Sequence, residues 1–187
     1  LLQMSDSGGK DRWMLFTATD LLMHNAPTEQ ASQVAAVCFK AAKTAAKQAA
    51  FKTAARFADF GWSLISKKMR TNYKLGIELL SLAAEMHYCC GSIATAKARV
   101  ECVYSRAINI QDRFRANHVL LQCYSNESDY DSSVKVGIDL LRETGVNFPK
   151  NPGKLSAIGN LITLKRKLRG QTAQDLYNLP IMKNKLL

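Results

Sequence analysis

The sequence predicts an all-α fold, in which about three degenerate helical hairpins form an α-α superhelix between terminal capping helices. Composition is the first reason, because alanine, leucine and lysine are abundant in this chain of 187 residues and all three favour helices. The second reason is that helix breakers are few, with only four prolines and ten glycines. The third is that the alternation of apolar and polar residues typical of strands is scarce.

The first element expected is a helix over residues 11–25, in which Trp13 and Phe16 recur at helical spacing. Pro27 follows and cannot continue the helix, so the helix is expected to end before it. Residues 1–10 become polar and glycine-containing toward their end. We expect them to form a connector or a frayed terminus.

The first hairpin is expected at about residues 30–65. This stretch is rich in alanine, contains no proline, and is longer than an ordinary globular helix. We therefore expect two helices with a break at about residues 47–49. Small side chains let the two helices approach closely, which favours a hairpin over one long helix.

The second and third hairpins are expected at about residues 72–107 and 110–145. In the second hairpin, Gly91 is predicted to stop the first helix, and Ser92 is predicted to cap the next one. In the third, Gly145 is the predicted left-handed stop of the second helix.

Residues 153–179 are expected to form a C-terminal helical cap. Pro149 and Pro152 prevent the preceding helix from continuing into this region. An extended segment at residues 178–182 is expected after the cap. Residues 11–187 are therefore predicted to form a single helical-repeat domain.

Small residues recur at equivalent positions of the hairpins, in the pattern of tetratricopeptide repeats. Such residues let the two helices of a hairpin cross closely, and larger side chains fill the gaps between neighbouring hairpins. The spacing between hairpins is longer than the roughly 34 residues of a standard tetratricopeptide unit, so the repeats are degenerate. In the second hairpin, Ala84 and Ala96 are twelve residues apart with Gly91 between them. The same frame places Ala42, Ala54 and Gly61 in the first hairpin and Leu121, Ser133 and Leu140 in the third, where two leucines stand in the pattern.

Five stretches of the sequence resemble one family of helical-repeat proteins. They are FTATDLLMHN, VAAVCFKAAKTAAKQAAFKTAARFADFGWSLI, YKLGIELLSLAAEMHYCCGSIATAKARV, YDSSVKVGIDLLRETGVNFPKNP and LYNLPIM. In this order they resemble the tetratricopeptide-like region of large multidomain signalling proteins. Those proteins carry a serine/threonine-kinase-like domain and a STAND or AAA-type ATPase before the region, and GAF and often histidine-kinase domains after it. The resemblance covers about residues 16–182.

The resemblance implies a non-catalytic scaffold or sensor segment. The kinase and ATPase motifs of that family belong to its other domains, so no catalytic or cofactor-binding residue is carried over to this chain. The stretch YCCGSIATA lacks the acidic turn that the family usually has there, so a surface contact at this turn is expected to differ. Because the chain begins without Met and ends within a helical pattern, we expect it to be a segment of a longer protein.

The net charge of +11 is concentrated in two zones. Residues 40–74 contain nine basic residues and one acidic residue, and the chain from residue 150 onward contains eight and one. Basic stripes on helical solenoids can hold nucleic-acid backbones or acidic peptides. Base stacking would also need aromatic residues among the lysines, and none is interleaved there. Nucleic acid is therefore the weaker of the two basic-face partners.

Two sets of residues are candidates for partner binding. The main hypothesis is that the first helices of the hairpins line a concave surface that binds a peptide or another domain of the same chain. Its candidate contact residues are Lys43, Asn72, Lys74, Asn117 and Gln122. The alternative is that a basic face binds nucleic acid or an acidic partner. Its candidate residues are Lys40, Lys47, Lys52, Arg56, Lys165, Arg166, Lys167 and Arg169.

The sequence does not indicate a catalytic, cofactor or metal site. His24, His87 and His118 show none of the spacings of zinc motifs. Cys90 follows His87 by three residues, but a nucleophilic cysteine also needs an oriented base and access to substrate. We therefore expect packing roles for both. A deep pocket around His87, Cys90 and a carboxylate would instead favour an enzyme.

The five cysteines are odd in number and form no C-x-x-C pair. This favours reduced, mostly buried thiols and a cytoplasmic location over a disulfide framework. The sequence shows neither the pattern of a signal peptide nor an apolar run of about 18 residues, so secretion and a membrane span are not expected.

Overall fold

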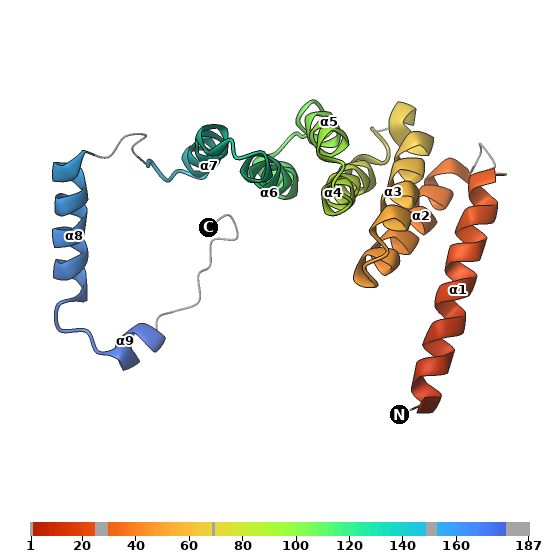
Figure 1. Ribbon diagram of the computed structural model, residues 1–187, viewed down its shortest axis with the longest axis horizontal. Helices are drawn as coiled ribbons and strands as arrows, with labels where there is room; N and C mark the ends of the chain where they lie inside the picture. Colours follow the sequence, from red (N-terminus) through yellow and green to blue (C-terminus); the bar gives the residue numbers. More distant parts are fainter. Residues whose placement is uncertain (1, 25–29, 69, 149–152, 179–187) are drawn as a thin grey trace. The chain divides into compact units, whose positions relative to one another are not determined.

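The computed structural model describes residues 2–24, 30–68, 70–148 and 153–178. Every regular element in these residues is a helix, which confirms the all-α fold (Figure 1). The elements are α1 (Leu2–His24), α2 (Ala31–Lys47), α3 (Phe51–Ile65), the short 3-10 helix η2 (Ser66–Lys68), α4 (Tyr73–Cys89), α5 (Ile93–Tyr104), α6 (Ile110–Asn126), α7 (Tyr130–Glu143), α8 (Lys154–Leu168) and α9 (Ala173–Tyr177). The predicted hairpins therefore correspond to α2–α3, α4–α5 and α6–α7.

The chain divides into two compact units, which we call unit 1 (residues 1–133) and unit 2 (residues 134–187). The sequence predicted one repeat domain over residues 11–187, but the division falls inside α7. Residues beyond 133 bury little apolar surface, because Ile138 is the only buried residue of α7 and every described side chain of α8 is exposed.

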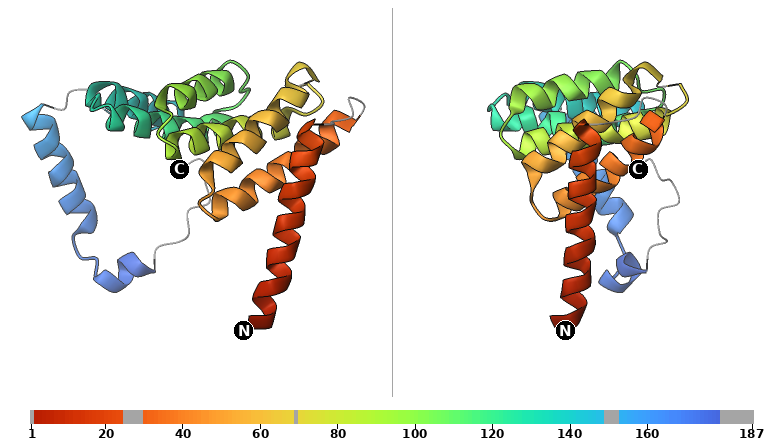
Figure 2. Two further views of the ribbon diagram at one scale, coloured as in Figure 1. Left: turned by 45° about the vertical axis from the view of Figure 1, so that its right-hand side comes forward. Right: turned by 90° about the vertical axis from the view of Figure 1, so that its right-hand side faces the viewer.

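The helices of unit 1 pack as successive neighbours (Figures 1 and 2). Each helix from α2 to α5 contacts the next one along the chain. In addition, α2 contacts α4 and α4 contacts α6, so the first helices of consecutive hairpins lie against one another. Helix α1 packs against α2. This arrangement is that of stacked hairpins, in which no hairpin buries its apolar face alone.

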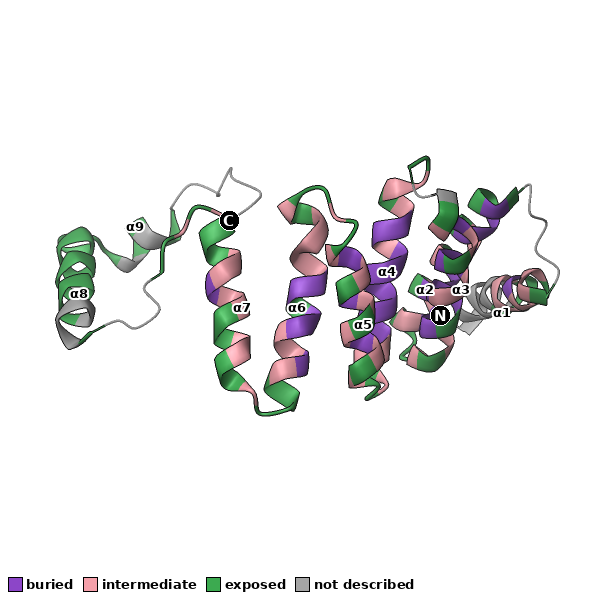
Figure 3. Cartoon of the chain, turned by 90° about the horizontal axis from the view of Figure 1, so that it is seen from above, coloured by how far each residue is buried: buried purple, intermediate pink, exposed green. Residues whose placement is uncertain are grey.

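The tightest part of the core lies where α2, α3 and α4 meet, at Gly61. A Cβ atom added to Gly61 would lie 3.0 Å from the Cβ of Cys38 and 3.1 Å from the Cδ2 of Leu79. The missing side chain therefore permits the close approach of three helices. Figure 3 shows the buried residues concentrated on α2 to α6. Four alanines of the predicted repeat positions are fully buried, namely Ala42, Ala54, Ala84 and Ala96.

Left-handed residues mark the predicted turns. Ala49, between α2 and α3, has a φ of +57°, and the break at this place confirms the predicted position. Gly91 and Gly145 have φ values of +76° and +89°, which confirms both predicted glycine stops. Ser92 occupies the N-cap position of α5 as predicted, but its side chain makes no capping hydrogen bond.

The N-terminal helix is longer than predicted. Helix α1 begins at Leu2, so residues 2–10 are helical and do not form the expected connector. Two adjacent glycines lower helix propensity there, but without a proline they do not stop the helix. Its end at His24 lies next to the predicted end. Residues 179–182 of the predicted extended segment lie outside the described residues.

Candidate functional site

A small hollow lies between α4 and α6, the first helices of two consecutive hairpins. Its volume is about 110 Å³. The lining is mostly polar and carries charges of both signs. We call it the α4–α6 hollow, and its lining residues are Lys74, Ile77, Glu78, Ser81, Gln111, Asp112 and Arg115.

Arg115 on α6 ties this helix to two carboxylates of α4. Its Nε and Nη2 atoms donate to the two carboxylate oxygens of Glu85 at 2.9 and 2.7 Å, and its Nη1 atom lies 2.8 Å from Oε2 of Glu78. The hydrogen bonds to Glu85 raise the pKa of the guanidinium further above its usual value. Such a bidentate contact fixes the orientation of the planar guanidinium as well as its position. The charged groups of Arg115 and Glu78 are therefore held in fixed positions along one wall of the hollow.

Asp112 joins the starts of α4 and α6 at the other side of the hollow. Its Oδ2 atom accepts hydrogen bonds from the hydroxyl of Tyr73 and, at 3.2 Å, from the backbone N–H of Asn109. The Tyr73 oxygen in turn accepts the backbone N–H of Ile108 at 2.7 Å. Burial, together with the hydrogen bond to Asp112, raises the pKa of Tyr73. These bonds hold the two helix starts at a fixed distance.

Ser81 on α4 supplies a buried polar group to the hollow. Only 2% of its surface is exposed, and its hydroxyl makes no side-chain hydrogen bond within the part of the chain that the structure describes. Among the described residues, no fully buried side-chain oxygen or nitrogen lacks a hydrogen-bond partner, so the Ser81 oxygen is not sealed in the protein interior and faces the space of the hollow. The hydroxyl is therefore available to a group that enters the hollow.

The structure assigns different roles to the five predicted contact residues. Lys74 is exposed and lines the α4–α6 hollow, and Gln122 on α6 is half-buried. Lys43 is exposed on α2, where its Nζ atom lies 5.3 Å from the centre of the Phe39 ring of the same helix.

Two of the five predicted contact residues form hydrogen bonds to neighbouring helices. Asn117 is only 7% exposed and accepts a hydrogen bond from the hydroxyl of Tyr104 on α5, which corrects its assignment to an exposed surface. Asn72 accepts a hydrogen bond from the hydroxyl of Ser32, which links the starts of α4 and α2. The side chains of both asparagines therefore bind neighbouring helices.

The predicted basic face is divided between the two units. In unit 1, Lys40, Lys47 and Lys52 are exposed, whereas Nη2 of Arg56 is paired with Oδ1 of Asp20 on α1 at 2.7 Å. In unit 2, the exposed basic residues lie on α8 and directly after it, namely Lys165, Arg166, Lys167 and Arg169.

A second hollow, of about 600 Å³, lies over α3 and the turn between α4 and α5. Here Asp59 on α3 accepts hydrogen bonds from Nε2 of His87 and from Nε of Arg99, both at 2.7 Å. The hydrogen bond that Arg99 donates to Asp59 raises the pKa of Arg99. We call it the Asp59 hollow, and its lining residues are Lys52, Ala55, Arg56, Asp59, His87, Cys90 and Ser92.

The Asp59 hollow brings together the three groups that the enzyme hypothesis required, but not in a catalytic arrangement. Within the described chain, the thiol of Cys90 makes no hydrogen bond to His87, so the histidine is not placed to activate it. The Asp59 carboxylate is occupied by His87 and Arg99. We therefore interpret this cluster as a polar contact that holds three helices together.

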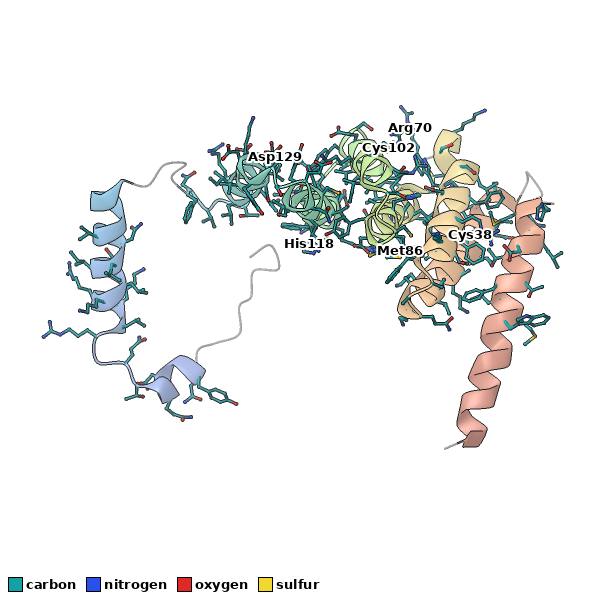
Figure 4. All side chains as sticks on the ribbon, in the orientation of Figure 1. Cys38, Arg70, Met86, Cys102, His118 and Asp129 are labelled. Carbon is teal, nitrogen blue, oxygen red and sulfur yellow. The ribbon has the colours of Figure 1, made fainter. Side chains whose placement is uncertain are left out.

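All five cysteines are free thiols, but the expectation that they are mostly buried is wrong, because only two of the five are buried. Cys38 and Cys123 are buried, Cys90 and Cys102 are half-buried, and Cys89 is exposed. Cys38 lies on α2 and faces α3, and Figure 4 shows it within the packed part of unit 1. Burial raises the pKa of Cys38 from 9.0 to about 11.

We expect Cys38 to react with a thiol reagent far more slowly than an ordinary thiol. The two-unit rise in its pKa leaves roughly a hundredfold less thiolate at pH 8, and burial also blocks access of the reagent. Alkylation of the native chain, followed by peptide mass spectrometry, measures each rate. Exposed Cys89 serves as the internal comparison for access, although burial of its thiol and the neighbouring Cys90 raise its pKa too. Equal rates at Cys38 and Cys89 in the native chain, before denaturant is added, would contradict the prediction.

Sequence reasoning missed the polar contacts between hairpins. Glu78 and Glu85 are seven residues apart on α4, a spacing that places them on one helix face. That signal was present, but their partner Arg115 lies on another hairpin, 30 residues after Glu85. Spacing within one helix does not identify which residue of another helix faces it.

Among the described residues, no helix is both long and apolar enough to cross a membrane. The described residues also contain no cluster of three or more histidine, cysteine or acidic side chains placed to bind a metal ion. Comparison of the chain with protein-family models, with curated proteins and with solved structures finds no match.

Proposed function

We propose that unit 1 is a non-catalytic docking module that binds a protein segment at the α4–α6 hollow. The segment comes from a partner protein or from another domain of the same polypeptide. The resemblance to the repeat region of large signalling ATPases and kinases supports a scaffold or sensor role in the cytoplasm.

The hydroxyl of Ser81, which makes no side-chain hydrogen bond within the described residues, is the observation that carries this proposal. It opens into a hollow whose charged walls are held by contacts within the protein, so the hollow is formed before a ligand arrives. Sites for small molecules and cofactors usually measure about 300–1,000 Å³. A hollow of about 110 Å³ is too small for them and has room for about one side chain.

Lys74 gives the hollow an exposed charge at its edge. It forms no ion pair with the described residues, whereas Arg115 is neutralised by Glu78 and Glu85. A polar side chain of a bound peptide could therefore enter the hollow, with an acidic neighbour meeting Lys74. The alternative, binding of nucleic acid by the basic face of unit 1, has less support because Arg56 is already paired with Asp20.

Photo-crosslinking from inside the hollow tests this function. A photoreactive phenylalanine analogue replaces Gln111, and the chain is expressed in its source cells, irradiated and analysed by mass spectrometry. We expect one defined protein segment to be cross-linked, with a yield reduced at least fivefold by Lys74→Glu. Lys135→Glu on α7 makes the same charge change at another exposed lysine and should leave the yield unchanged. Equal loss in both variants, or cross-links to nucleic acid alone, would contradict the proposal.

A further inference from the structure

Helix α8 of unit 2 presents large apolar side chains to solvent. Their exposed fractions lie between 41% and 61%, which is unusual for five aliphatic side chains on one helix of fifteen residues. Together they form an apolar surface with nothing covering it in the described part of unit 2. The residues are Ile158, Leu161, Ile162, Leu164 and Leu168.

These side chains share one side of α8, and one lysine lies among them. At 100° per residue, the five aliphatic residues cover a continuous arc slightly less than half of the helix circumference. Lys165 follows Leu161 by four residues and Ile162 by three, so it lies near the middle of that arc. A shallow hollow on α8 has a lining that includes Ile162, Lys165 and Leu168. The apolar side of α8 therefore has a positive charge near its centre.

Every charged residue in and around α8 is basic. Residues 144–174 contain no aspartate or glutamate. Six basic residues lie in the same stretch, namely Lys150, Lys154, Lys165, Arg166, Lys167 and Arg169. Whatever covers the apolar side must therefore carry negative charge as well as apolar surface.

Other occupants fit this chemistry less well. A second copy of residues 144–174 would bring six further positive charges and no negative ones. Nucleic acid would match the charges but leave the aliphatic side chains uncovered. A bilayer would cover them, but a helix lying in its surface keeps its cations on the polar side, whereas Lys165 would point toward the acyl chains. A protein groove can place a carboxylate opposite Lys165.

We propose that α8 is a ligand helix for a partner protein with an apolar, carboxylate-lined groove. Ile158, Leu161, Ile162 and Leu168 fill the groove, and Lys165 pairs with a carboxylate within it. The surface belongs to unit 2, so the proposal is independent of the docking function of unit 1.

The test uses calmodulin as a probe, because calcium opens an apolar groove between its helices and the protein as a whole is acidic. The 187-residue chain is titrated with calmodulin in calcium and, separately, in a calcium chelator. We expect binding in calcium that is lost in the chelator, where the groove closes while the acidic charge remains. Binding that persists without calcium would show attraction by charge alone and would overturn the proposal.

Paired variants locate the contact. Ile162→Asp and Lys165→Glu change the apolar side, and each should weaken binding at least tenfold. Thr163→Asp and Lys167→Glu make similar charge changes on the opposite side of α8 and should weaken binding less than threefold. Circular dichroism checks that helix content is the same in each pair. Equal loss within a pair, or no binding at all, would overturn the proposal.

Lipid vesicles test the membrane as the other occupant. The chain is sedimented with vesicles that contain about 30% phosphatidylserine, and with vesicles of phosphatidylcholine alone. We expect little binding to either at physiological salt. Tighter binding to the anionic vesicles than to calmodulin, weakened by Ile162→Asp, would assign α8 to a lipid surface and overturn the proposal.

Discussion

Replacement of Phe57 by alanine is expected to lower the free energy of unfolding of unit 1 by about 3–5 kcal/mol. Phe57 lies on α3 with none of its surface exposed, and its ring centre is 5.9 Å from that of Phe16 on α1. Truncation removes buried apolar area and leaves a cavity that the closely packed surroundings only partly fill. Contacts between α1 and α3 are lost as well.

Urea unfolding followed by the fluorescence of Trp62 measures this effect, because Trp62 is only 8% exposed in the folded chain. The exposed Trp13 is replaced by phenylalanine in every variant so that one tryptophan reports. Tyr130→Ala is the matched control, since Tyr130 also belongs to unit 1 but is 65% exposed, and its truncation should change stability by less than about 0.5 kcal/mol. A loss at Phe57 no larger than that at Tyr130 would contradict the packing described here.

The helices were predictable because their signals are local. Gly91 and Gly145 adopt positive φ values that follow from the absence of a Cβ atom, and each stops a helix where the sequence placed the stop. The alanine-rich stretch over 30–65 was divided correctly at Lys47, although nothing indicated that Ala49 would adopt a positive φ. The division of the chain inside α7 was missed because it depends on how much surface each helix buries, and this is a tertiary property.

The candidate site was less predictable because side-chain roles depend on the neighbouring hairpin. Lys74 and Asn117 were both predicted to contact a partner. Lys74 lines the hollow, whereas Asn117 is buried against Tyr104. Both are polar residues on first helices, and the sequence offers no feature that separates them. Ser81 was overlooked for a similar reason, since a serine within an apolar helix face is indistinguishable from a packing residue until its burial is known.

Polar contacts between hairpins suggest how unit 1 keeps a binding surface open. Arg115 joins α6 to α4, and Asp59 joins α3 to both α4 and α5. These contacts use most of the nearby charges internally and hold the helices apart at fixed positions. Lys74 and Ser81 keep no internal partner among the described residues, which is why we propose the α4–α6 hollow as the docking site even though the Asp59 hollow is larger.

Gly61→Val is expected to destabilise unit 1 by about 2–3 kcal/mol through overpacking. A Cβ atom alone would already lie 3.0 Å from the Cβ of Cys38, 3.1 Å from Cδ2 of Leu79 and 3.4 Å from the carbonyl oxygen of Ala35. Valine adds two methyl groups, and its side chain has one strongly preferred rotamer in a helix. Three helices must then separate, whereas Gly61→Ala should cost less because a gain in helix propensity of about 1 kcal/mol offsets part of the strain.

A double-mutant cycle with Leu79→Val distinguishes overpacking from a general effect of valine on α3. Valine at position 79 has no δ carbon, so it removes one of the close contacts that a side chain at position 61 would make. Urea unfolding followed by the fluorescence of Trp62 gives the free energy of unfolding of each variant. The loss in the double variant should be smaller than the sum of the two single losses by at least about 0.5 kcal/mol. Strict additivity would mean that Leu79 does not limit the space at Gly61, and that the approach of α3 to α4 is not set by the missing side chain.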